Sequence, residues 1–492
     1  MKITIVGGGT AGWISAYVLQ KSFPKHEITI IESSKIGIIG VGEGGTHILG
    51  SLIKNSSVQE DFDIRDFIVA TDAAPKHGFK HVSWTNQKNH FYIPLDLNLS
   101  SDPRVDDFLA MKIIQGQPIH AISDTGVLIE QEKTIFHKDN INIENLEGLS
   151  YHFDGRLVGE FFKKHVVEKG ASLIDAVILD IKIGQEGQIE SLLLDNGNTI
   201  VSDLFVDCTG MAKLLMNKLG GKWISYKDTL LVNSALPYPI PYNPPVSLEP
   251  VSISTALSAG WTWRLPLAGR FGCGYVFCDN FITFDQAHLE LQDHLGIEIK
   301  PFREIKFNSG RFENVWIKNC VSLGLAAAFV EPLEATSIHA STLQVQKLVS
   351  TIKNGINDQS IREYNSQVST LYDEIKEFIA LHYTGGRNDT EFWIAANKAA
   401  RTDFVNHVLE IAKTRFLRPE DIPNKESNIS YQAWNQLLAG LGHINKDVAL
   451  KQLANKNVDE QYASFRSHIL SRLENCKTVE DTLVNGRFNV AG

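Results

Sequence analysis

Residues 2–32 read KITIVGGGTAGWISAYVLQKSFPKHEITIIE, which predicts a strand, a glycine loop, a helix and a second strand that ends in an acid. The loop GGGTAG places a glycine at each fixed position of the pattern G-x-G-x-x-G. The first glycine permits a tight turn, the second lets backbone approach a pyrophosphate, and the third lets the helix pack closely on the strand. The candidate cofactor-binding residues of this loop are Gly7, Gly9, Thr10, Ala11 and Gly12.

The acid that ends the second strand is Glu32, twenty residues after Gly12. At this spacing a carboxylate accepts hydrogen bonds from a ribose hydroxyl. A lone glycine pattern is weak evidence, because glycine loops are common turns. Here strand, loop, helix, strand and acid follow one another in order, so the sequence predicts a dinucleotide-binding unit with Glu32 as a further candidate cofactor ligand.

Length and composition narrow the class of protein. A length of 492 residues favours two or three domains. The formal charge is −10 and there is no long Lys/Arg cluster, which argues against nucleic-acid binding. Five cysteines in no C-x-x-C pair favour a reduced, cytoplasmic protein. The longest apolar run, residues 321–330, is too short to span a bilayer, and the chain begins on its first strand, so we expect neither a membrane segment nor a signal peptide.

A second glycine-rich segment, residues 37–45 (GIIGVGEGG), follows the first unit. Its five glycines, interleaved with valine and isoleucine, indicate backbone that presses against a flat or phosphorylated ligand. An ordinary flexible turn is the alternative. The candidate cofactor-binding residues in this segment are Gly40, Val41, Gly42 and Glu43.

Later strands return to this core. A predicted helix that opens at 151 and runs to about 169 precedes strands over 172–183, 189–195 and 199–207. The last strand runs into Asp207-Cys-Thr-Gly210, and residues 319–324 form another return strand that ends at Gly324. Separated returns to one core favour a long, extended cofactor, so FAD is the better prediction than NAD. Asp207, Gly210 and Gly324 are the candidate cofactor-binding residues of these returns.

The remaining pattern divides the chain. Residues 225–315 are rich in strand-forming residues and carry a cluster of prolines that excludes long helices there, which predicts an antiparallel sheet. Helical patterning dominates from about residue 338. The predicted domains are a composite FAD-binding domain (1–84, 151–215 and 316–350), a β-rich substrate side (85–150 and 216–315) and a helical C-terminal region (351–492).

The motif GWTWRLP, residues 260–266, places Trp261 and Trp263 on one face of a strand. Alone, such a pair is most often sheet core. Together with GGGTAGW, GVGE and FVEPLEATS, in this order along the chain, the motif resembles the flavin-dependent halogenases of the tryptophan-halogenase type. The resemblance implies an α/β fold with a Rossmann-type core like that of p-hydroxybenzoate hydroxylase. It also implies FAD reduced by a separate flavin reductase, and hypohalous acid, made from dioxygen and halide, that reaches an aromatic substrate.

The resemblance also assigns roles to residues. It implies that Lys76 is the catalytic lysine, which holds hypohalous acid or forms a haloamine, and that Glu334 is the catalytic carboxylate. Alone, Lys76 would be read as a solvated surface group and Glu334 as a helix-start acid. The backbone of Thr336 and Ser337 is the implied halide site. Trp261 and Trp263 are implied to keep the organic substrate away from the flavin.

The sequence departs from the family pattern in places. Ala335-Thr336-Ser337 stands where Ser-Thr-Gly is common, and Gly44-Gly45 stands where Ala-Thr is usual. These changes leave the halide open among chloride, bromide and iodide. The arene stays open between an indole, a phenol and a larger or carrier-tethered compound. A flavin monooxygenase or other FAD oxidoreductase, and a flavin-binding protein without catalysis, are the alternative functions. A homo-oligomer is also left open.

Overall fold

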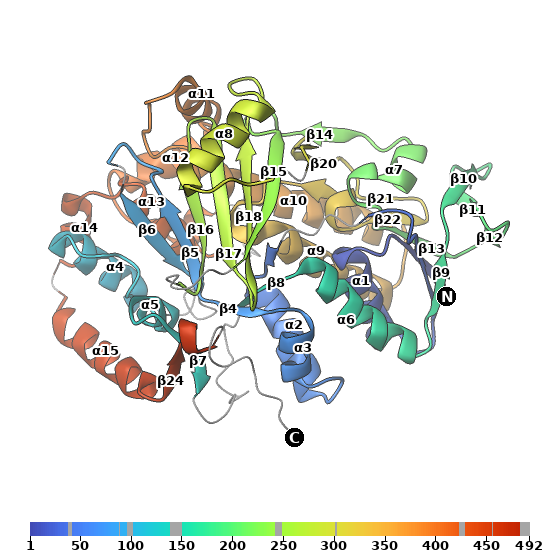
Figure 1. Ribbon diagram of the computed structural model, residues 1–492, viewed down its shortest axis with the longest axis horizontal. Coiled ribbons are helices and arrows are strands. Elements are labelled where there is room, and N and C mark those ends of the chain that lie inside the picture. The colour runs from blue at the N-terminus through green and yellow to red at the C-terminus, as the bar shows by residue number, and fades with distance from the viewer. Residues whose placement is uncertain are drawn as a thin grey trace. The chain divides into compact units, whose positions relative to one another are not determined.

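The computed structural model describes residues 1–37, 42–87, 89–95, 102–137, 150–241, 248–300, 303–422, 429–454 and 456–482 (Figure 1). The chain forms two compact units. The first unit comprises residues 1–40, 154–226 and 307–373, and the second comprises 41–153, 227–306 and 374–492. The candidate residues Gly40 and Val41 lie outside the described ranges.

A six-stranded sheet organises the first unit, in the order β21-β22-β13-β1-β2-β9. Its strands are β1 (Lys2–Val6), β2 (Glu27–Glu32), β9 (Ser172–Asp175), β13 (Leu204–Asp207), β21 (Trp316–Ile317) and β22 (Cys320–Ser322). All neighbours pair in parallel except β21 and β22. The central β1 is buried from Ile3 onward, because a parallel strand is covered on both faces.

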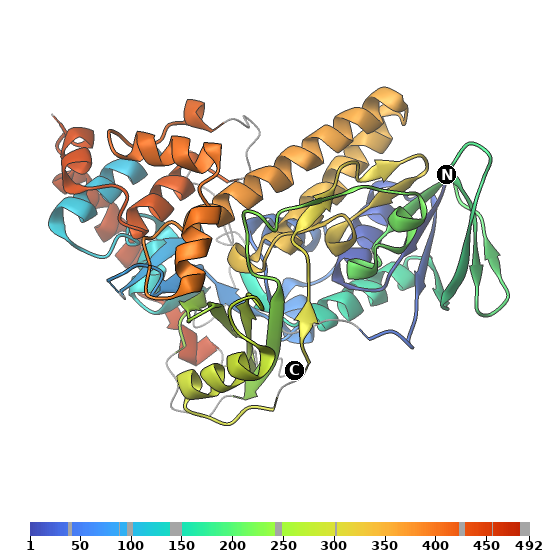
Figure 2. The same cartoon turned by 90° about the horizontal axis from the view of Figure 1, so that it is seen from above.

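Helices cover this sheet. The helix α1 (Thr10–Ser22) leaves the glycine loop and packs against α6 (Gly155–Glu168) and α9 (Thr336–Asn354). The strands β10 (Ile178–Ile183), β11 (Ile189–Leu194) and β12 (Thr199–Ile200) form a separate sheet at one side of the unit, next to β9 (Figures 1 and 2). The unit also contains α7 (Leu214–Lys218), β14 (Trp223–Ser225), β20 (Gly310–Phe312) and β23 (Ala328–Phe329).

A seven-stranded sheet organises the second unit, in the order β19-β15-β18-β17-β16-β5-β6. Its strands are β5 (Gly78–Val82), β6 (His90–Pro94), β15 (Ser234–Pro241), β16 (Val251–Ala256), β17 (Gly260–Pro266), β18 (Arg270–Phe277) and β19 (Ile305–Lys306). Only the pair β5–β16 is parallel. The prolines of β15 fit because β19 pairs only with Ser234 and Ala235, so the rest of β15 is an edge.

The second unit also holds most of the helices. They are α2 (His47–Val58), α3 (Ile64–Ala70), α4 (Arg104–Gln115), α5 (Asp124–Glu130), α8 (Phe284–Leu295), α11 (Glu391–Ala399), α12 (Asp403–Ala412), α13 (Tyr431–Gly440), α14 (Lys446–Gln452) and α15 (Asp459–Leu473). The 25-residue α10 (Asp358–His382) contributes residues to both units. The strands β7 (Lys133–His137) and β24 (Cys476–Thr478) pair with each other. None of the helices in the described ranges combines the length and apolar character that a bilayer crossing requires.

Several local predictions from sequence differ from the structure. The predicted strands over 172–183 and 199–207 are each divided in two, as β9 and β10 and as β12 and β13, and the two parts lie in different sheets. Residues 150–153 form the strand β8 (Ser150–Phe153) instead of opening a helix, and it pairs with β3 (Glu43–Gly44) and β4 (Ala74–Lys76). The helix begins after Asp154, whose carboxylate caps it by accepting from the Arg156 and Leu157 amides. The helix α8 interrupts the predicted β-rich stretch, with a capping box at its start. The predicted mixed α/β class with a helical C-terminal region is confirmed.

Candidate active site

The glycine loop has the geometry that a dinucleotide requires. Gly7 has φ +115°, and a Cβ there would lie 2.2 Å from the Cys208 carbonyl oxygen. A Cβ at Gly12 would lie 1.9 Å from the Gly7 oxygen. At Gly9 an added Cβ would meet no heavy atom within 4 Å. The crowded glycines therefore serve the turn and the packing of α1, whereas Gly9 borders space that a phosphate can enter.

Glu32 ends β2, as the sequence predicts, and its carboxylate has two partners that sequence reasoning missed. The Trp13 indole nitrogen donates to it at 3.2 Å, and the Lys163 ammonium forms an ion pair with it. A Cβ at Gly8 would lie 2.1 Å from a Glu32 carboxylate oxygen, so the acid also lies against the glycine loop. Lys163 belongs to α6, more than a hundred residues away, and no local signal in the sequence links the two.

The return strands bring glycines to the same edge of the sheet. Gly210 (φ +64°) follows β13 and Gly324 (φ +62°) follows β22. A Cβ at Gly324 would lie 2.6 Å from the Ala11 Cβ, so only glycine fits beside the start of α1. This edge holds the carboxyl ends of parallel strands, where open α/β sheets bind ligands.

Asp207, the last residue of β13, stabilises the turn at this edge of the sheet. Its buried carboxylate accepts hydrogen bonds from the Thr209 hydroxyl at 2.7 Å and from the Leu215 and Met216 amides at 2.9 and 3.0 Å. Burial raises the pKa of Asp207, and these hydrogen bonds oppose the rise. Both oxygens are thus engaged in holding the turn that carries Gly210. The residues of the first unit fit a dinucleotide such as FAD, because Gly9, with open space around an added Cβ, follows the carboxyl end of β1.

In the second unit, the described part of the other glycine segment is tightly packed. Gly42 has φ +89°, and a Cβ there would lie 2.9 Å from the Gly272 Cα. Glu43 pairs with Phe153 in the small sheet β3-β8-β4. The backbone that approaches Gly42 closely is therefore that of Gly272, in the protein's own strand β18.

Lys76 ends β4 and is fully buried, with 0% of its surface exposed. Its ammonium donates to the Gly45 carbonyl at 3.0 Å and lies 3.8 Å from the centroid of the Phe79 ring. A lysine is rarely buried completely, since removing its charge from water is costly. This burial sets Lys76 apart from an ordinary surface lysine.

The tryptophan pair lies on β17. The Trp261 and Trp263 ring centroids are 6.4 Å apart, and Trp261 is buried. Trp263 pairs with Gly274 on β18, where a Cβ would lie only 1.8 Å from the Trp263 ring. Glycine at 274 therefore leaves room for the indole to lie over the neighbouring strand. The pair forms a rigid aromatic wall on one face of the sheet.

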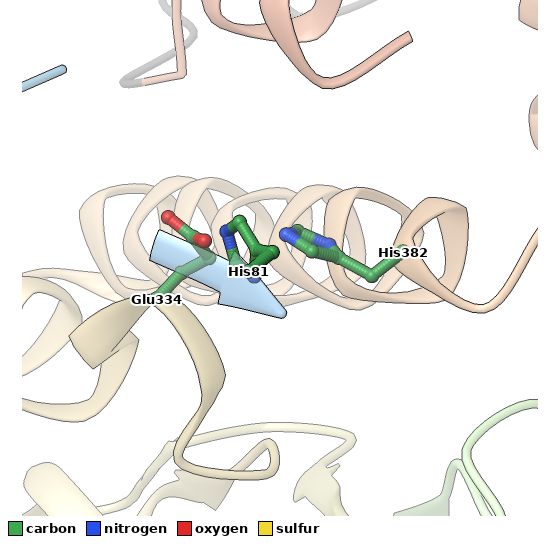
Figure 3. Close-up of side chains that lie close together, drawn as sticks. All are labelled: His81, Glu334 and His382. Carbon is green, nitrogen blue, oxygen red and sulfur yellow. The ribbon is translucent and has the colours of Figure 1, made fainter. Parts of the chain in front are cut away.

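An aromatic and polar cluster on the same sheet face was missed from the sequence. The Ser254 hydroxyl lies 2.8 Å from His81 Nδ1 and accepts from the Trp84 indole at 3.0 Å. The His81 ring centroid lies 5.0 Å from that of His382 (Figure 3). Alternation predicts the strand that carries His81, but it does not reveal that Ser254 stands opposite it on β16.

Glu334 belongs to the first unit, in the short turn η5 (Leu333–Ala335) that precedes α9. Glu334 and Ala335 have φ of +64° and +55°, a left-handed conformation that costs a residue with a side chain roughly 1 kcal/mol or more. Such strain persists where the surrounding structure enforces it, and it is common at active sites. The helix α9 follows, and its N-cap residue is Ala335, whose side chain cannot accept a hydrogen bond. No capping side chain therefore accepts from the amides of the first turn, which begins at Thr336.

Comparisons with known proteins identify the family of the chain. A family model described as tryptophan halogenase matches residues 2–456. The 7-chloro-L-tryptophan 6-halogenase KtzR of Kutzneria sp. (strain 744) is 32% identical over 475 residues, 90% of each chain. The tryptophan 6-halogenase SttH of Streptomyces toxytricini is 30% identical over 472 residues, also 90% of each chain.

Solved structures agree as well. The crystal structure of SttH matches with a TM-score of 0.88, at 27% identity over 98% of both chains. BrvH, a flavin-dependent halogenase from Brevundimonas sp. BAL3, matches with a TM-score of 0.85, at 26% identity over 98% of both chains. These matches confirm the predicted family, the predicted fold class and a flavin-dependent halogenase as the class of enzyme. The chain belongs to the tryptophan halogenase family.

Proposed function

We propose that the enzyme uses reduced FAD, dioxygen and a halide ion to halogenate an electron-rich aromatic compound, with indoles as the first class to test. The observation that carries the proposal is the complete burial of Lys76 beside the tryptophan-bearing sheet of the second unit. Bound reduced FAD would supply two electrons and the halide two more, so that dioxygen ends as water and hypohalous acid. The Gly9 edge and the Glu32 carboxylate would hold its phosphates and ribose.

Lys76 would aim the halogen. Free hypohalous acid attacks arenes with little selectivity, so positioning is the main contribution of the protein. An ammonium desolvated beside the Phe79 ring donates a strong hydrogen bond to the oxygen of hypohalous acid and so fixes the halogen in space. Haloamine formation at the same nitrogen is the other route, with loss of water.

We propose that Glu334 is the catalytic carboxylate of the reaction. Its carboxylate would stabilise the positive charge that develops on the ring, and then take the proton from the halogenated carbon. The strained backbone at Glu334 supports a functional role, because a residue without one would gain stability in an ordinary conformation.

The halide would bind at the amides of Thr336 and Ser337. They begin a 19-residue helix whose N-terminus has no side-chain cap, and such amides attract anions. The tryptophan pair on β17 would keep the arene from the flavin, so that halide, rather than the ring, is oxidised.

The partners follow from this chemistry. A separate flavin reductase would supply reduced FAD. The five cysteines at 208, 273, 278, 320 and 476 are all unpaired and buried, which supports a reducing, cytoplasmic setting. Self-association stays a prediction, to be measured by light scattering.

The test is an assay of the purified enzyme with FAD, a flavin reductase, NADH and oxygen. Chloride, bromide and iodide are each offered with indole, tryptophan, a phenol and a carrier-tethered arene, and products are read by mass spectrometry. A haloarene that appears only with halide supports the proposal. Oxygen insertion without any need for halide would identify a monooxygenase instead.

A further inference from the structure

The small sheet β3-β8-β4 places a serine hydroxyl opposite the catalytic lysine. Lys76 on β4 pairs directly with Ser150 on β8, and Ala74 pairs with His152. Directly opposed residues of an antiparallel pair project to the same face, with Cβ atoms about 5 Å apart. Ser150 and His152 therefore lie on the face of β8 that carries the Lys76 side chain, and Tyr151 lies on the other face.

Both side chains converge on Gly45. The Lys76 ammonium donates to the Gly45 carbonyl at 3.0 Å, and a Cβ built on Gly45 would lie 3.5 Å from Ser150 Oγ. The same Cβ would lie 3.3 Å from the Phe153 ring. Glycine at 45 thus leaves the serine hydroxyl next to the backbone that anchors the lysine.

The Ser150 hydroxyl is fully buried, and the described part of the chain offers its oxygen no hydrogen-bond partner. Leaving a buried hydroxyl unsatisfied costs about 1–3 kcal/mol, so such a group demands a partner. An ammonium is a strong donor for a hydroxyl oxygen, directly or across one water.

His152 completes the surroundings without adding a charge. Burial first, and then the positive charge of Lys76, hold the pKa of His152 well below its usual range. The imidazole is therefore neutral, and its Nε2 lies 2.8 Å from the Ser252 hydroxyl. This leaves Ser150 as the hydroxyl closest to Gly45 on the lysine face of β8.

We propose that Ser150 is a positioning residue for Lys76: one water bridges the two side chains, accepting from the Lys76 ammonium and donating to the Ser150 hydroxyl oxygen, and so fixes the place of the ammonium in the reaction. The inference rests on the role proposed for Lys76. It adds a residue beyond the tryptophan pair, Lys76 and Glu334, and it explains why a buried hydroxyl is placed opposite a buried lysine.

The variant Ser150→Ala removes only the hydroxyl. We expect total oxidant formation, trapped as hypohalous acid, to be unchanged, and the haloarene formed per oxidant to fall roughly 10-fold, the scale of one hydrogen bond to a charged group. Tyr151→Phe is the matched control, since it removes a buried hydroxyl from the opposite face of the same strand, and its ratio should stay within twofold of wild type. Gly45 lacks a positive φ, so Ser150→Ala/Gly45→Ser moves the hydroxyl across to the residue that follows β3 and should restore much of the ratio.

A second readout separates this inference from the proposed function. With [13Cε]lysine labelling, the Lys76 NMR signal is assigned by its absence in Lys76→Met. It should shift in Ser150→Ala and stay in place in Tyr151→Phe. An unchanged Lys76 signal in Ser150→Ala, or an unchanged haloarene ratio in an active enzyme, overturns the inference. If the wild-type enzyme halogenates nothing, the proposed function fails, and the Lys76 signal alone decides whether Ser150 holds the lysine.

Discussion

The ammonium of Lys76 lies 3.8 Å from the centroid of the Phe79 ring, in contact with its face. Only His77 separates the strands β4 and β5 that carry the two residues. A desolvated cation gains about 2 kcal/mol from such a contact, which offsets part of the cost of burying it. The structure thus buries a lysine amine close to the sheet that bears the tryptophan pair.

The glycine loop makes a paired prediction. Gly9→Ala should leave the free energy of unfolding within about 1 kcal/mol of wild type, because its Cβ has open space, yet weaken FAD binding by roughly 10-fold or more as the methyl group enters the phosphate space. Gly12→Ala should lower stability severely, because its Cβ collides with the Gly7 carbonyl. Urea unfolding and flavin fluorescence titration measure the two effects. Equal FAD affinity in Gly9→Ala would argue against a phosphate at this edge.

Glu334 is expected to act after the halogen has been delivered. Glu334→Gln should lower haloarene formation by roughly 10-fold to 100-fold, as for loss of one positioned base, while hypohalous acid still forms. Glu313→Gln is the control, because this exposed glutamate of the same unit only pairs with Lys222. Loss of the oxidant together with the product would instead assign Glu334 to flavin or halide binding.

The left-handed backbone at Ala335 offers a site where a substitution should stabilise the protein. Glycine adopts its left-handed conformation without strain, so Ala335→Gly should raise the free energy of unfolding by roughly 1 kcal/mol. Ala340→Gly, within α9, should lower it by a similar amount, since glycine is a poor helix former. Urea denaturation of the two variants measures whether the free energy of unfolding rises in the first and falls in the second. Destabilisation by Ala335→Gly would mean that the alanine methyl group makes contacts that outweigh its strain.

Much of the first unit follows from sequence because its signals are local. The run of apolar residues, the glycines and Glu32 predict β1, the loop and β2 within about thirty residues. The sequence prediction begins the helix at 151, three residues before Asp154, although an aspartate is a typical helix-start residue and its carboxylate caps α6 in the structure. Hydrogen bonds between Ser254, Trp84 and His81 depend on pairing between distant strands, and no periodicity reports them. Lys76 and Glu334 were proposed through resemblance, because their types alone favour surface positions.

Asp106 makes stability depend on pH. Burial, only partly opposed by a hydrogen bond from Asn435, raises its pKa to about 7. Between roughly pH 4 and 7 the folded state keeps a proton that the unfolded state releases, so the free energy of unfolding falls as pH rises. Asp106→Asn should remove this dependence and add roughly 1 kcal/mol or more at pH 7. The control is Asp107→Asn, which changes a carboxylate paired with Lys456 and should leave this pH dependence in place. A pH profile unchanged by Asp106→Asn would show that Asp106 is ionised in the folded protein.

The central claim is that Lys76 delivers the halogen, and its test is the yield of bromoarene from indole by wild type and by Lys76→Ala in the same reductase-coupled assay. Lys80→Ala is the matched control, because this lysine of the next strand is only partly buried and is paired with Glu249. The account predicts that Lys76→Ala loses roughly 10²-fold to 10⁴-fold of the bromoarene while FAD still binds and hypobromous acid still forms. Equal bromoarene from Lys76→Ala and wild type would contradict it.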